Sequence, residues 1–222
     1  ICGLGSIGQR HARILRKIFG KDVDIGAVRT RKRAIVINDD MTVTDGIDPI
    51  KHYGLIEYSS FNDAYQAGQD AVFVTNPISM HVETALHASR HNAHVFVEKP
   101  LSHDLNQVNV LAEEIDRRGL TAMVGYQLRF HPMFEHVKRA IDQRLLGDII
   151  AADVHFGEWL PGMHPYEDYR ESHAARADQG GGVILALSHE VDLVSWLFGI
   201  PETVAATGGH IDRKSTRLNS SH

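Results

Sequence analysis

The stretch Ala93-His94-Val95-Phe96-Val97-Glu98-Lys99-Pro100 joins a short apolar run to an acid, an amine and a proline. An apolar run such as residues 95–97 is typical of a strand buried in a parallel sheet. In an open α/β sheet, ligands bind outside the carboxyl ends of the strands, so this strand would bring Lys99 to a binding site. Proline disfavours the helical conformation at the residue before it, which favours an extended or turn geometry at Lys99. The alternative is a strand that ends in a solvated turn.

A glycine-rich turn, Gly3-Leu4-Gly5-Ser6-Ile7-Gly8, has the spacing Gly-x-Gly-x-x-Gly. Such glycines permit a tight turn and let a diphosphate approach the N-terminus of the following helix. Residues 23–28 read as the next strand at the correct distance, which gives the start of a β-α-β unit. Ile1-Cys2 reads as the last piece of a strand, so we expect the chain to be a fragment. The expected dinucleotide-binding residues here are Gly3, Gly5, Ser6, Ile7 and Gly8.

Strands and helices alternate through the first 125 residues. Besides residues 95–97, three further apolar runs read as strands, at residues 55–58, 71–74 and 121–124. Segments with helical spacing of apolar residues lie between them. Residues 34–54, by contrast, hold turn formers and few periodic positions, which predicts a surface excursion. We therefore expect an α/β fold whose N-terminal domain, residues 1–125, is a doubly wound parallel sheet of the Rossmann type.

The basic turn Arg29-Thr30-Arg31 follows the predicted second strand. About 20 residues past the glycines, a site that prefers NAD usually places an acid for the ribose hydroxyls. Here an arginine fork and a hydroxyl stand instead, and they suit the 2′-phosphate of NADP. We predict that Arg29, Thr30 and Arg31 bind the cofactor, NADP or NAD, with NADP preferred. The alternative is a basic, solvated turn.

The pattern changes after Gly125, where we place a domain boundary. Polar and aromatic side chains, Gln127 and Arg129 among them, follow directly on a strand end. A helix is predicted at about residues 133–144 and a long strand of another sheet at 148–156. Residues 126–212 would form a partial second domain for substrate binding and oligomerisation. The polar residues 213–222 read as a non-native or disordered tail.

Two segments of the second domain carry candidate binding groups. Residues 159–179 gather polar side chains, including His164 and Tyr169, a composition that suits a polyhydroxylated ligand and is equally typical of a solvated loop. A triple glycine, Gly180-Gly181-Gly182, then precedes an apolar helix that is expected to end at Gly199. His189 and Asp192 lie on a polar stripe of this helix, and buried polar groups need partners or a use. A helical histidine is also often a purely structural group.

Composition restricts the function classes. The chain has 222 residues, 43% of them hydrophobic, which is enough for one large domain or two smaller ones. A formal charge of −5 argues against nucleic-acid binding, and no stretch approaches the ~20 apolar residues that span a bilayer. The single cysteine, Cys2, fits a reducing compartment. We expect a cytoplasmic protein with no nucleic-acid partner, no membrane partner and no metal site.

Several motifs together resemble one family. They are the glycine-rich turn, Thr75-Asn76-Pro77 with His81, Glu98-Lys99-Pro100, residues 125–132, and the triple glycine followed by His189-Glu190-Val191-Asp192. In this order they resemble the glucose-fructose oxidoreductase/inositol dehydrogenase (Gfo/Idh/MocA) family, and Glu98-Lys99-Pro100 is the most specific of them. The resemblance implies an N-terminal Rossmann domain. It also implies a C-terminal α/β domain built on a mixed, mostly antiparallel sheet that is often used for oligomerisation.

The resemblance further implies a function and a set of site residues. The implied activity is NAD(P)-dependent oxidation or reduction of a hydroxyl or carbonyl on a sugar, cyclitol or nucleotide sugar, in a homodimer or homotetramer. Lys99 corresponds to the active-site lysine and His189 to the catalytic histidine. The further cofactor contacts expected are Thr75, Asn76, Pro77, His81, Glu98 and Lys99. The expected substrate contacts are Lys99, Gln127, Arg129, His164, Tyr169 and Asp192.

One position departs from the family pattern. Many dehydrogenases of the family carry an aspartate four residues before the histidine, where this chain has Leu185, followed by Ala186. A histidine without an orienting carboxylate is a weaker base, unless Asp192 or a loop residue replaces that acid. Two alternatives stay open, the second of them because this acid is missing. One is a redox-assisted, NAD-dependent glycosidase of the same family, and the other is a dinucleotide-binding regulatory protein that has lost catalysis.

Overall fold

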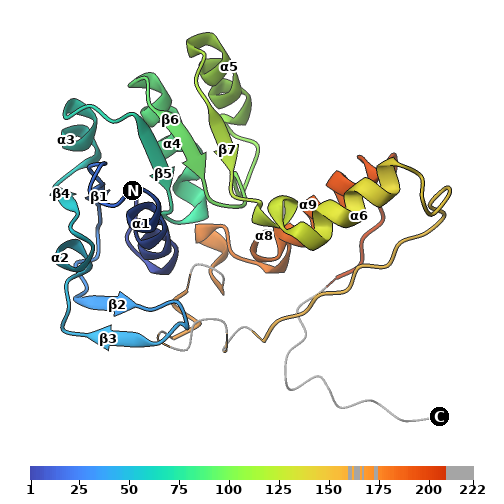
Figure 1. The fold of residues 1–222 in the computed structure, drawn as a ribbon, viewed down its shortest axis with the longest axis horizontal. Coiled ribbons are helices and arrows are strands. Elements are labelled where there is room, and N and C mark those ends of the chain that lie inside the picture. Colours follow the sequence, from blue (N-terminus) through green and yellow to red (C-terminus); the bar gives the residue numbers. More distant parts are fainter. Residues whose placement is uncertain (160–161, 163–165, 167, 173–174, 209–222) are drawn as a thin grey trace.

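The computed structural model describes residues 1–159, 162, 166, 168–172 and 175–208. An α/β body forms the larger part, and helix α6 (Pro132–Asp142) extends from it as part of an arm (Figure 1). No helix within the described ranges is long and apolar enough to cross a membrane. The predicted tail, residues 213–222, lies outside these ranges.

One parallel sheet organises the body. Its strands are β1 (Gly26–Val28), β4 (Ile56–Tyr58), β5 (Ala71–Val74), β6 (His94–Val97) and β7 (Ala122–Val124). β1 pairs with β4, while β5, β6 and β7 form the other half of the sheet. Cys2 joins the two halves through single parallel bridges to Val28 and Val74. The resulting order, β4-β1-Cys2-β5-β6-β7, is the doubly wound arrangement. The predicted Rossmann-like sheet is confirmed.

Helices cover both faces of this sheet. The valines of β5 and β6 pack in one core with α4 (His81–Arg90) and α5 (Val108–Arg118). Neighbouring side chains along a strand point to opposite faces, so Phe73 and Phe96 face the other way, toward α1 (Ser6–Phe19). Figure 1 shows α1 and α4 on opposite sides of the sheet. Two short helices complete the body, α3 (Phe61–Gln66) after β4 and η1 (Ile78–Met80) before α4.

Residues 34–54 fold into a hairpin and a helix, so the predicted surface excursion was wrong. β2 (Ile35–Ile37) pairs antiparallel with β3 (Val43–Asp45), and α2 (Pro49–Tyr53) follows. Val36 and Ile37 are buried. Strands of three residues are too short to show an alternating pattern in the sequence, and for this reason the prediction failed.

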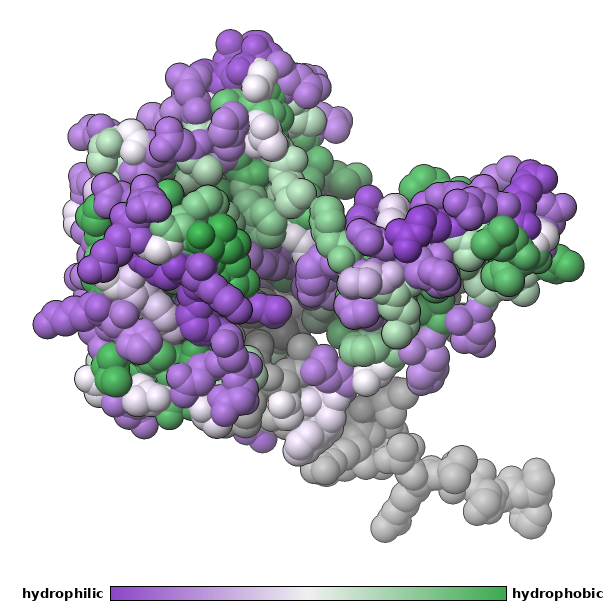
Figure 2. Space-filling model, viewed as in Figure 1, coloured by the Kyte–Doolittle hydropathy of each residue, from purple (hydrophilic) through white to green (hydrophobic). Residues whose placement is uncertain are grey.

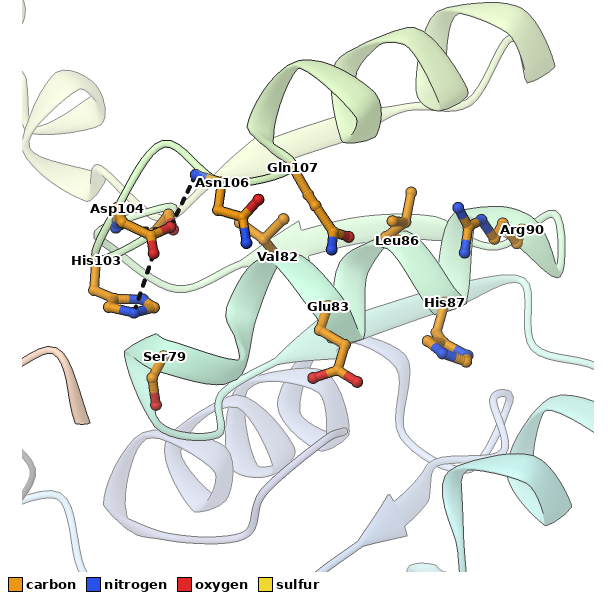
Figure 3. A pocket seen from close by; sticks show the side chains of 11 residues that line it. Ser79, Val82, Glu83, Leu86, His87, Arg90, His103, Asp104, Asn106 and Gln107 are labelled. Carbon is orange, nitrogen blue, oxygen red and sulfur yellow. Dashed lines mark hydrogen bonds and ion pairs between the residues drawn. The ribbon is translucent and has the colours of Figure 1, made fainter. Parts of the chain in front are cut away.

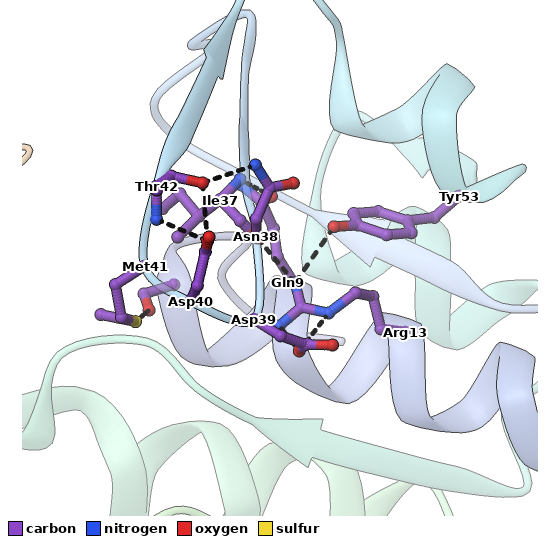
Figure 4. A network of polar contacts seen from close by, with 10 residues as sticks. Gln9, Arg13, Ile37, Asn38, Asp39, Asp40, Met41, Thr42 and Tyr53 are labelled. Atoms are coloured by element: carbon purple, nitrogen blue, oxygen red, sulfur yellow. Dashed lines mark hydrogen bonds and ion pairs between the residues drawn. The ribbon is translucent and has the colours of Figure 1, made fainter.

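Polar side chains of α1 fasten this hairpin to the body (Figure 4). Gln9, which is 1% exposed, accepts a bond from the Ile37 N–H at 2.9 Å and donates to the Ile35 carbonyl at 3.2 Å. Arg13 donates to the Ile37 carbonyl at 2.7 Å and to the Tyr53 hydroxyl at 3.2 Å. The helix of the glycine-rich turn is thereby fixed to the edge of the fold.

The region after residue 126 is mostly helical and short. The regular elements described there include η2 (Gln127–Phe130), α6, η4 (Ala177–Gln179), α8 (Val183–Ala186) and α9 (Ser188–Phe198). Residues 148–156 form no strand, contrary to prediction, because no other strand among the described residues lies beside them to pair with their backbone. The predicted mixed sheet is therefore not found in this part of the chain. Apolar side chains of residues 148–156 stay exposed instead, Ile150 at 97% and Phe156 at 53%. Figure 2 shows hydrophobic surface on the part of the molecule that extends from the α/β body.

Candidate active site

Lys99 lies two residues after the end of β6, at the carboxyl edge of the sheet. Its Nζ donates a hydrogen bond to the Ala186 carbonyl at 2.8 Å, which connects the edge of the sheet to the end of α8. Burial lowers the pKa of the Lys99 amine, and the carboxylates of Glu98, Glu190 and Glu158 oppose that shift. An amine of lowered pKa in such a position is a candidate for proton exchange with a ligand.

Two histidines, the partly buried His11 and the buried His81, hold the chain on both sides of Lys99. His11 Nε2 lies 2.6 Å from one carboxylate oxygen of Glu98, and the other oxygen accepts the Lys99 N–H at 3.2 Å. Beyond the lysine, the Lys99–Pro100 peptide bond is cis. The two ring nitrogens of His81 each lie 2.9 Å from a carbonyl oxygen, those of Pro100 and Asn76. His81, predicted to touch the cofactor, is thus occupied at both nitrogens by backbone.

His189 lies in the first turn of α9. The predicted single helix is divided into α8 and α9 at Leu187, which has φ −105° and ψ 39°. His189 Nε2 lies 3.3 Å from the amide nitrogen of Gln127, and the ring packs edge-on against Tyr126 at 5.9 Å. Burial lowers the pKa of the His189 imidazole, and the positive charge of Lys99 lowers it further. Near neutral pH the ring is therefore uncharged and able to accept a proton.

Asp192 does not replace the missing orienting acid. It forms a two-point ion pair with Arg129, with N–O distances of 2.9 and 2.6 Å. Within the described residues, His189 Nδ1 and Glu190 Oε2 are buried and have no hydrogen-bond partner. Buried polar atoms are normally paired, so these two are the atoms that a bound ligand would satisfy.

The predicted substrate contacts are divided by the structure. Gln127, Arg129 and Asp192 surround the start of α9 beside His189. Tyr169 lies elsewhere in the chain's polar segment, with the Arg170 guanidinium 4.9 Å above its ring. Among the described residues, no hydrogen bond or ion pair joins Tyr169 to Lys99 or His189. His164 lies outside the described ranges.

The glycine-rich turn has the space that a diphosphate needs. Gly3 has φ +99°, and a Cβ on Gly8 would collide with the Gly3 carbonyl, so both positions require glycine. Nothing lies within 4 Å of the place where a Cβ on Gly5 would stand. Gly5 is also the N-cap of α1, and no side chain caps the helix. The N–H groups of the first helical turn, at Ser6, Ile7 and Gly8, are therefore left for an anion.

The segment after β5 lies against this turn. Thr75 Oγ1 donates to the Gly3 carbonyl at 2.7 Å. The Asn76 amide donates to Thr84 Oγ1 at 2.8 Å, while its buried Oδ1 has no partner in the described part of the chain. Pro77 is exposed and precedes η1. The predicted cofactor residues of this segment thus stand between the glycine-rich turn and the loop after β6 that carries Lys99.

The basic turn does not present its first arginine to a phosphate. The Arg29 side chain is 5% exposed and pairs with Asp48 at 2.9 Å and with Glu57 at 3.0 Å. Hydrogen bonds to Glu57 and Asp48 raise the pKa of Arg29, and the same bonds lower the pKa of each carboxyl. Thr30 and Arg31 are exposed. The position of Arg29 therefore does not support the predicted preference for NADP.

A polar groove of about 280 Å³ lies between α4 and the loop before α5 (Figure 3). Its polar lining includes Glu83, His87, Arg90, His103, Asp104, Asn106 and Gln107. None of these residues belongs to the cluster around Lys99 and His189, where amine, imidazole and unpartnered polar atoms converge, so that cluster is the better candidate site. No group of three or more His, Cys, Asp or Glu within the described ranges is arranged to hold a metal ion.

Family comparisons agree with this geometry. Residues 1–126 match the oxidoreductase family with an NAD-binding Rossmann fold, and residues 134–220 match the GFO/IDH/MocA C-terminal domain. The chain belongs to the GFO/IDH/MocA oxidoreductase family. The resemblance predicted from the motifs is confirmed.

Individual relatives of this GFO/IDH/MocA chain are distant. It is 26% identical over 216 residues to the scyllo-inositol 2-dehydrogenase (NAD(+)) of Bacillus subtilis, which covers 95% of this chain and 56% of that protein. It is 28% identical over 143 residues to the 2,7-anhydro-N-acetylneuraminate hydratase of Escherichia coli, with 64% of this chain and 37% of that protein covered. The chain thus spans about half the length, or less, of these relatives.

Solved structures share the fold. The scyllo-inositol dehydrogenase of Lactobacillus casei, with bound NAD(H) and scyllo-inositol, superposes with a TM-score of 0.66 at 24% identity, covering 89% of this chain and 55% of that one. The WlbA dehydrogenase of Bordetella pertussis, in complex with NADH and UDP-GlcNAcA, gives a TM-score of 0.68 at 22% identity, covering 89% and 56%.

Proposed function

We propose that the protein is an NAD(P)-dependent oxidoreductase that acts on a hydroxyl or carbonyl group of a sugar, cyclitol or nucleotide sugar. The observation that carries the proposal is the pair formed by the Lys99 amine and the His189 imidazole. Both have a lowered pKa. Lys99 stands just past the carboxyl end of β6, and its Nζ bonds the carbonyl of Ala186, three residues before His189. The substrate class is taken from the relatives, which include dehydrogenases of scyllo-inositol.

Lys99 and His189 divide the acid-base work in this proposal. The Lys99 amine donates a hydrogen bond to the reacting oxygen, in place of its present bond to the Ala186 carbonyl. His189, uncharged near neutral pH, accepts the proton that the substrate hydroxyl releases, and returns it in the reverse direction. Gln127, 3.3 Å from His189, orients the imidazole, and Glu190 offers its unpartnered oxygen to a neighbouring substrate hydroxyl.

The cofactor proposed is NAD or NADP. A bound nicotinamide dinucleotide supplies the hydride acceptor or donor. Gly3, Gly5 and Gly8 with the first turn of α1 would hold its diphosphate, and Thr75 to Pro77 would line its path toward Lys99. Arg29 is engaged by Asp48 and Glu57, so a 2′-phosphate would depend on the exposed Thr30 and Arg31.

A redox-neutral reaction is the second candidate. Two observations favour it: Leu185 and Ala186 stand where many family dehydrogenases place an acid, and one group of relatives is named as hydratases of an anhydro sugar. The redox-assisted glycosidase belongs to the same class, because the cofactor would be restored within each catalytic cycle. A regulatory protein that binds the dinucleotide without catalysis is the third reading. The expected homo-oligomer and cytoplasmic location stay predictions.

One screen separates these functions. The full-length protein is incubated with NAD or NADP and panels of free sugars, cyclitols and nucleotide sugars, while the absorbance of reduced nicotinamide and the products are followed. Net cofactor reduction by one panel member supports the dehydrogenase. Product formation without net cofactor turnover supports the redox-neutral reaction. Tight NADH binding with neither result supports the regulatory protein and overturns the proposal.

A further inference from the structure

His11 stands where the cofactor helix, the sheet and the Lys99 loop meet. It projects from the second turn of α1 and lies against the rings of Phe73 and Phe96, at centroid distances of 5.3 and 5.1 Å. Because side chains alternate along a strand, Glu98 points to the same face as Phe96. The imidazole therefore meets the Glu98 carboxylate at the end of β6.

The contact between His11 and Glu98 is short and sheltered. The Nε2–Oε1 distance is 2.6 Å, and the side chains are 13% and 19% exposed. Burial opposes ionisation of Glu98, yet bonds from His11 and from the Lys99 N–H hold the pKa of this carboxyl below its usual value. Gly125 leaves the room for this arrangement, since a Cβ there would stand 3.3 Å from the Glu98 carboxylate.

Both carboxylate oxygens of Glu98 thus have hydrogen-bond partners, and neither partner is the amine of Lys99. One bonds His11, the other bonds the Lys99 N–H, and the Lys99 Nζ turns instead to the Ala186 carbonyl. The two charges nevertheless influence each other, since Glu98 raises the pKa of the Lys99 amine and Lys99 lowers the pKa of the Glu98 carboxyl. A Glu98 oxygen released from His11 would therefore be attracted to the amine. Its bond to His11 keeps the Glu98 carboxylate away from the Lys99 amine.

We propose that His11 is a positioning residue for Lys99: by holding the Glu98 carboxylate against α1, it keeps that carboxylate from pairing with the Lys99 amine. The amine is then free for the reacting oxygen of the substrate. This inference rests on the proposed function of Lys99. Helix α1 would then serve both parts of the site. Its first turn would hold the diphosphate, and its His11 fixes the loop that carries Lys99.

The alternative role of His11 is packing alone. In that case any ring of similar size between Phe73 and Phe96 would serve, and the state of the Lys99 amine would not depend on the imidazole nitrogen. The charged and titratable groups around Lys99 are Glu98, Glu190, Glu158 and His189. Of these, only Glu98 is bonded to His11.

The test measures the titration of the Lys99 amine itself. The lysines of the full chain are converted to ¹³C-dimethyl-lysine, and their NMR signals are followed against pH in the presence and absence of NADH. The Lys99→Arg variant identifies the Lys99 signal. The key variant is His11→Phe, which keeps a ring between the two phenylalanines and removes the bond to Glu98. His11→Leu, whose side chain has no polar atom, repeats the test if the phenyl ring prevents folding.

If the proposal holds, the freed carboxylate turns to the amine and the midpoint of the Lys99 titration rises by about 1 pH unit in either His11 variant, a roughly tenfold smaller uncharged fraction. Adding Glu98→Gln to His11→Phe removes the rise. The matched control is His91→Phe, an exposed histidine at the end of α4 that stacks on Tyr65, and it leaves the midpoint unchanged.

An unchanged Lys99 midpoint in a folded His11 variant overturns the proposal and assigns His11 to packing. This readout needs no substrate, so its failure is distinct from failure of the proposed function. A midpoint that rises in a protein without any turnover would support the positioning role and argue against the oxidoreductase.

Discussion

The Lys99 amine is bonded to a backbone carbonyl, that of Ala186 at 2.8 Å, next to Leu185, the position at which the family resemblance predicts an aspartate. A carbonyl orients an amine without the full negative charge that would stabilise its ammonium form. Burial therefore remains the largest influence on the pKa of Lys99, and it acts downward. The Lys99 amine is thus deprotonated more readily than an ordinary lysine, and His189 has no orienting carboxylate at position 185.

Lys99→Met is expected to abolish turnover and to leave NADH affinity nearly unchanged. Methionine keeps much of the bulk of the side chain and loses only the charged amine, so the loss should reach at least the ~10²–10⁴-fold typical of one acid-base group. The measurement is single-turnover hydride transfer with the substrate found by the screen, beside NADH titration. Lys99→Arg, which keeps a charged hydrogen-bond donor at this position, is the control and should retain more turnover than Lys99→Met. Unchanged transfer in Lys99→Met removes Lys99 from the mechanism.

Gly5→Ala and Gly8→Ala should separate cofactor binding from folding. A methyl group on Gly5 meets no atom within 4 Å, so the melting temperature should stay within about 1 °C of the wild type. It would stand where the diphosphate approaches, and NADH binding should weaken at least about tenfold. The same methyl on Gly8 collides with the Gly3 carbonyl and should lower both properties. Normal NADH affinity in Gly5→Ala would show that the dinucleotide binds elsewhere.

The sequence was sufficient to predict the body of the fold and the position of Lys99. Strands β5, β6 and β7 are short apolar runs bounded by polar residues, and each lies where the run predicted it. A site at the end of such a strand follows from the topology alone, because parallel strands end at one edge. Gly119 follows α5 with φ +64°, a conformation that glycine adopts readily at the end of a helix.

Contacts between residues far apart in the chain were not predictable in the same way. Arg29 reads as a phosphate ligand until its partners Asp48 and Glu57 are known, and no local pattern joins them to it. The break at Leu187 is equally hidden, since the surrounding residues keep helical apolar spacing. His11 carried no signal of its own, because its partner Glu98 lies 87 residues away.

Arg29→Ala is expected to destabilise the protein rather than to change cofactor choice. Its removal leaves two carboxylates without their shared cation, and the melting temperature at neutral pH should fall by at least about 2 °C. The pKa values of Asp48 and Glu57 are lowered in the folded state, so this stabilisation is present above their unfolded values near 4 and is lost as the pH falls further. Arg31→Ala, at an exposed position, is the matched control for stability. A selective loss of NADP binding in Arg29→Ala, with unchanged melting, would contradict this assignment.

The last prediction concerns His81, which is 2% exposed and lies between the carbonyl oxygens of Pro100 and Asn76. An uncharged ring donates to only one of them, and a second N–H requires protonation. Burial nevertheless lowers the pKa of His81, while the bonds to the two carbonyls act in the opposite direction. The unfolded chain, where the pKa is near 6.5, therefore binds this proton more readily than the folded one. His81 should therefore contribute its full stabilisation above about pH 6.5. Below that pH the free energy of unfolding should fall, by at most about 1.4 kcal/mol per pH unit.

The experiment compares the wild type with His81→Gln by chemical denaturation between pH 5 and 8, and the exposed His91→Gln is the control. The effect of His81 is the difference in the slope of unfolding free energy against pH. Parallel curves for all three proteins would show that His81 titrates alike in the folded and unfolded states.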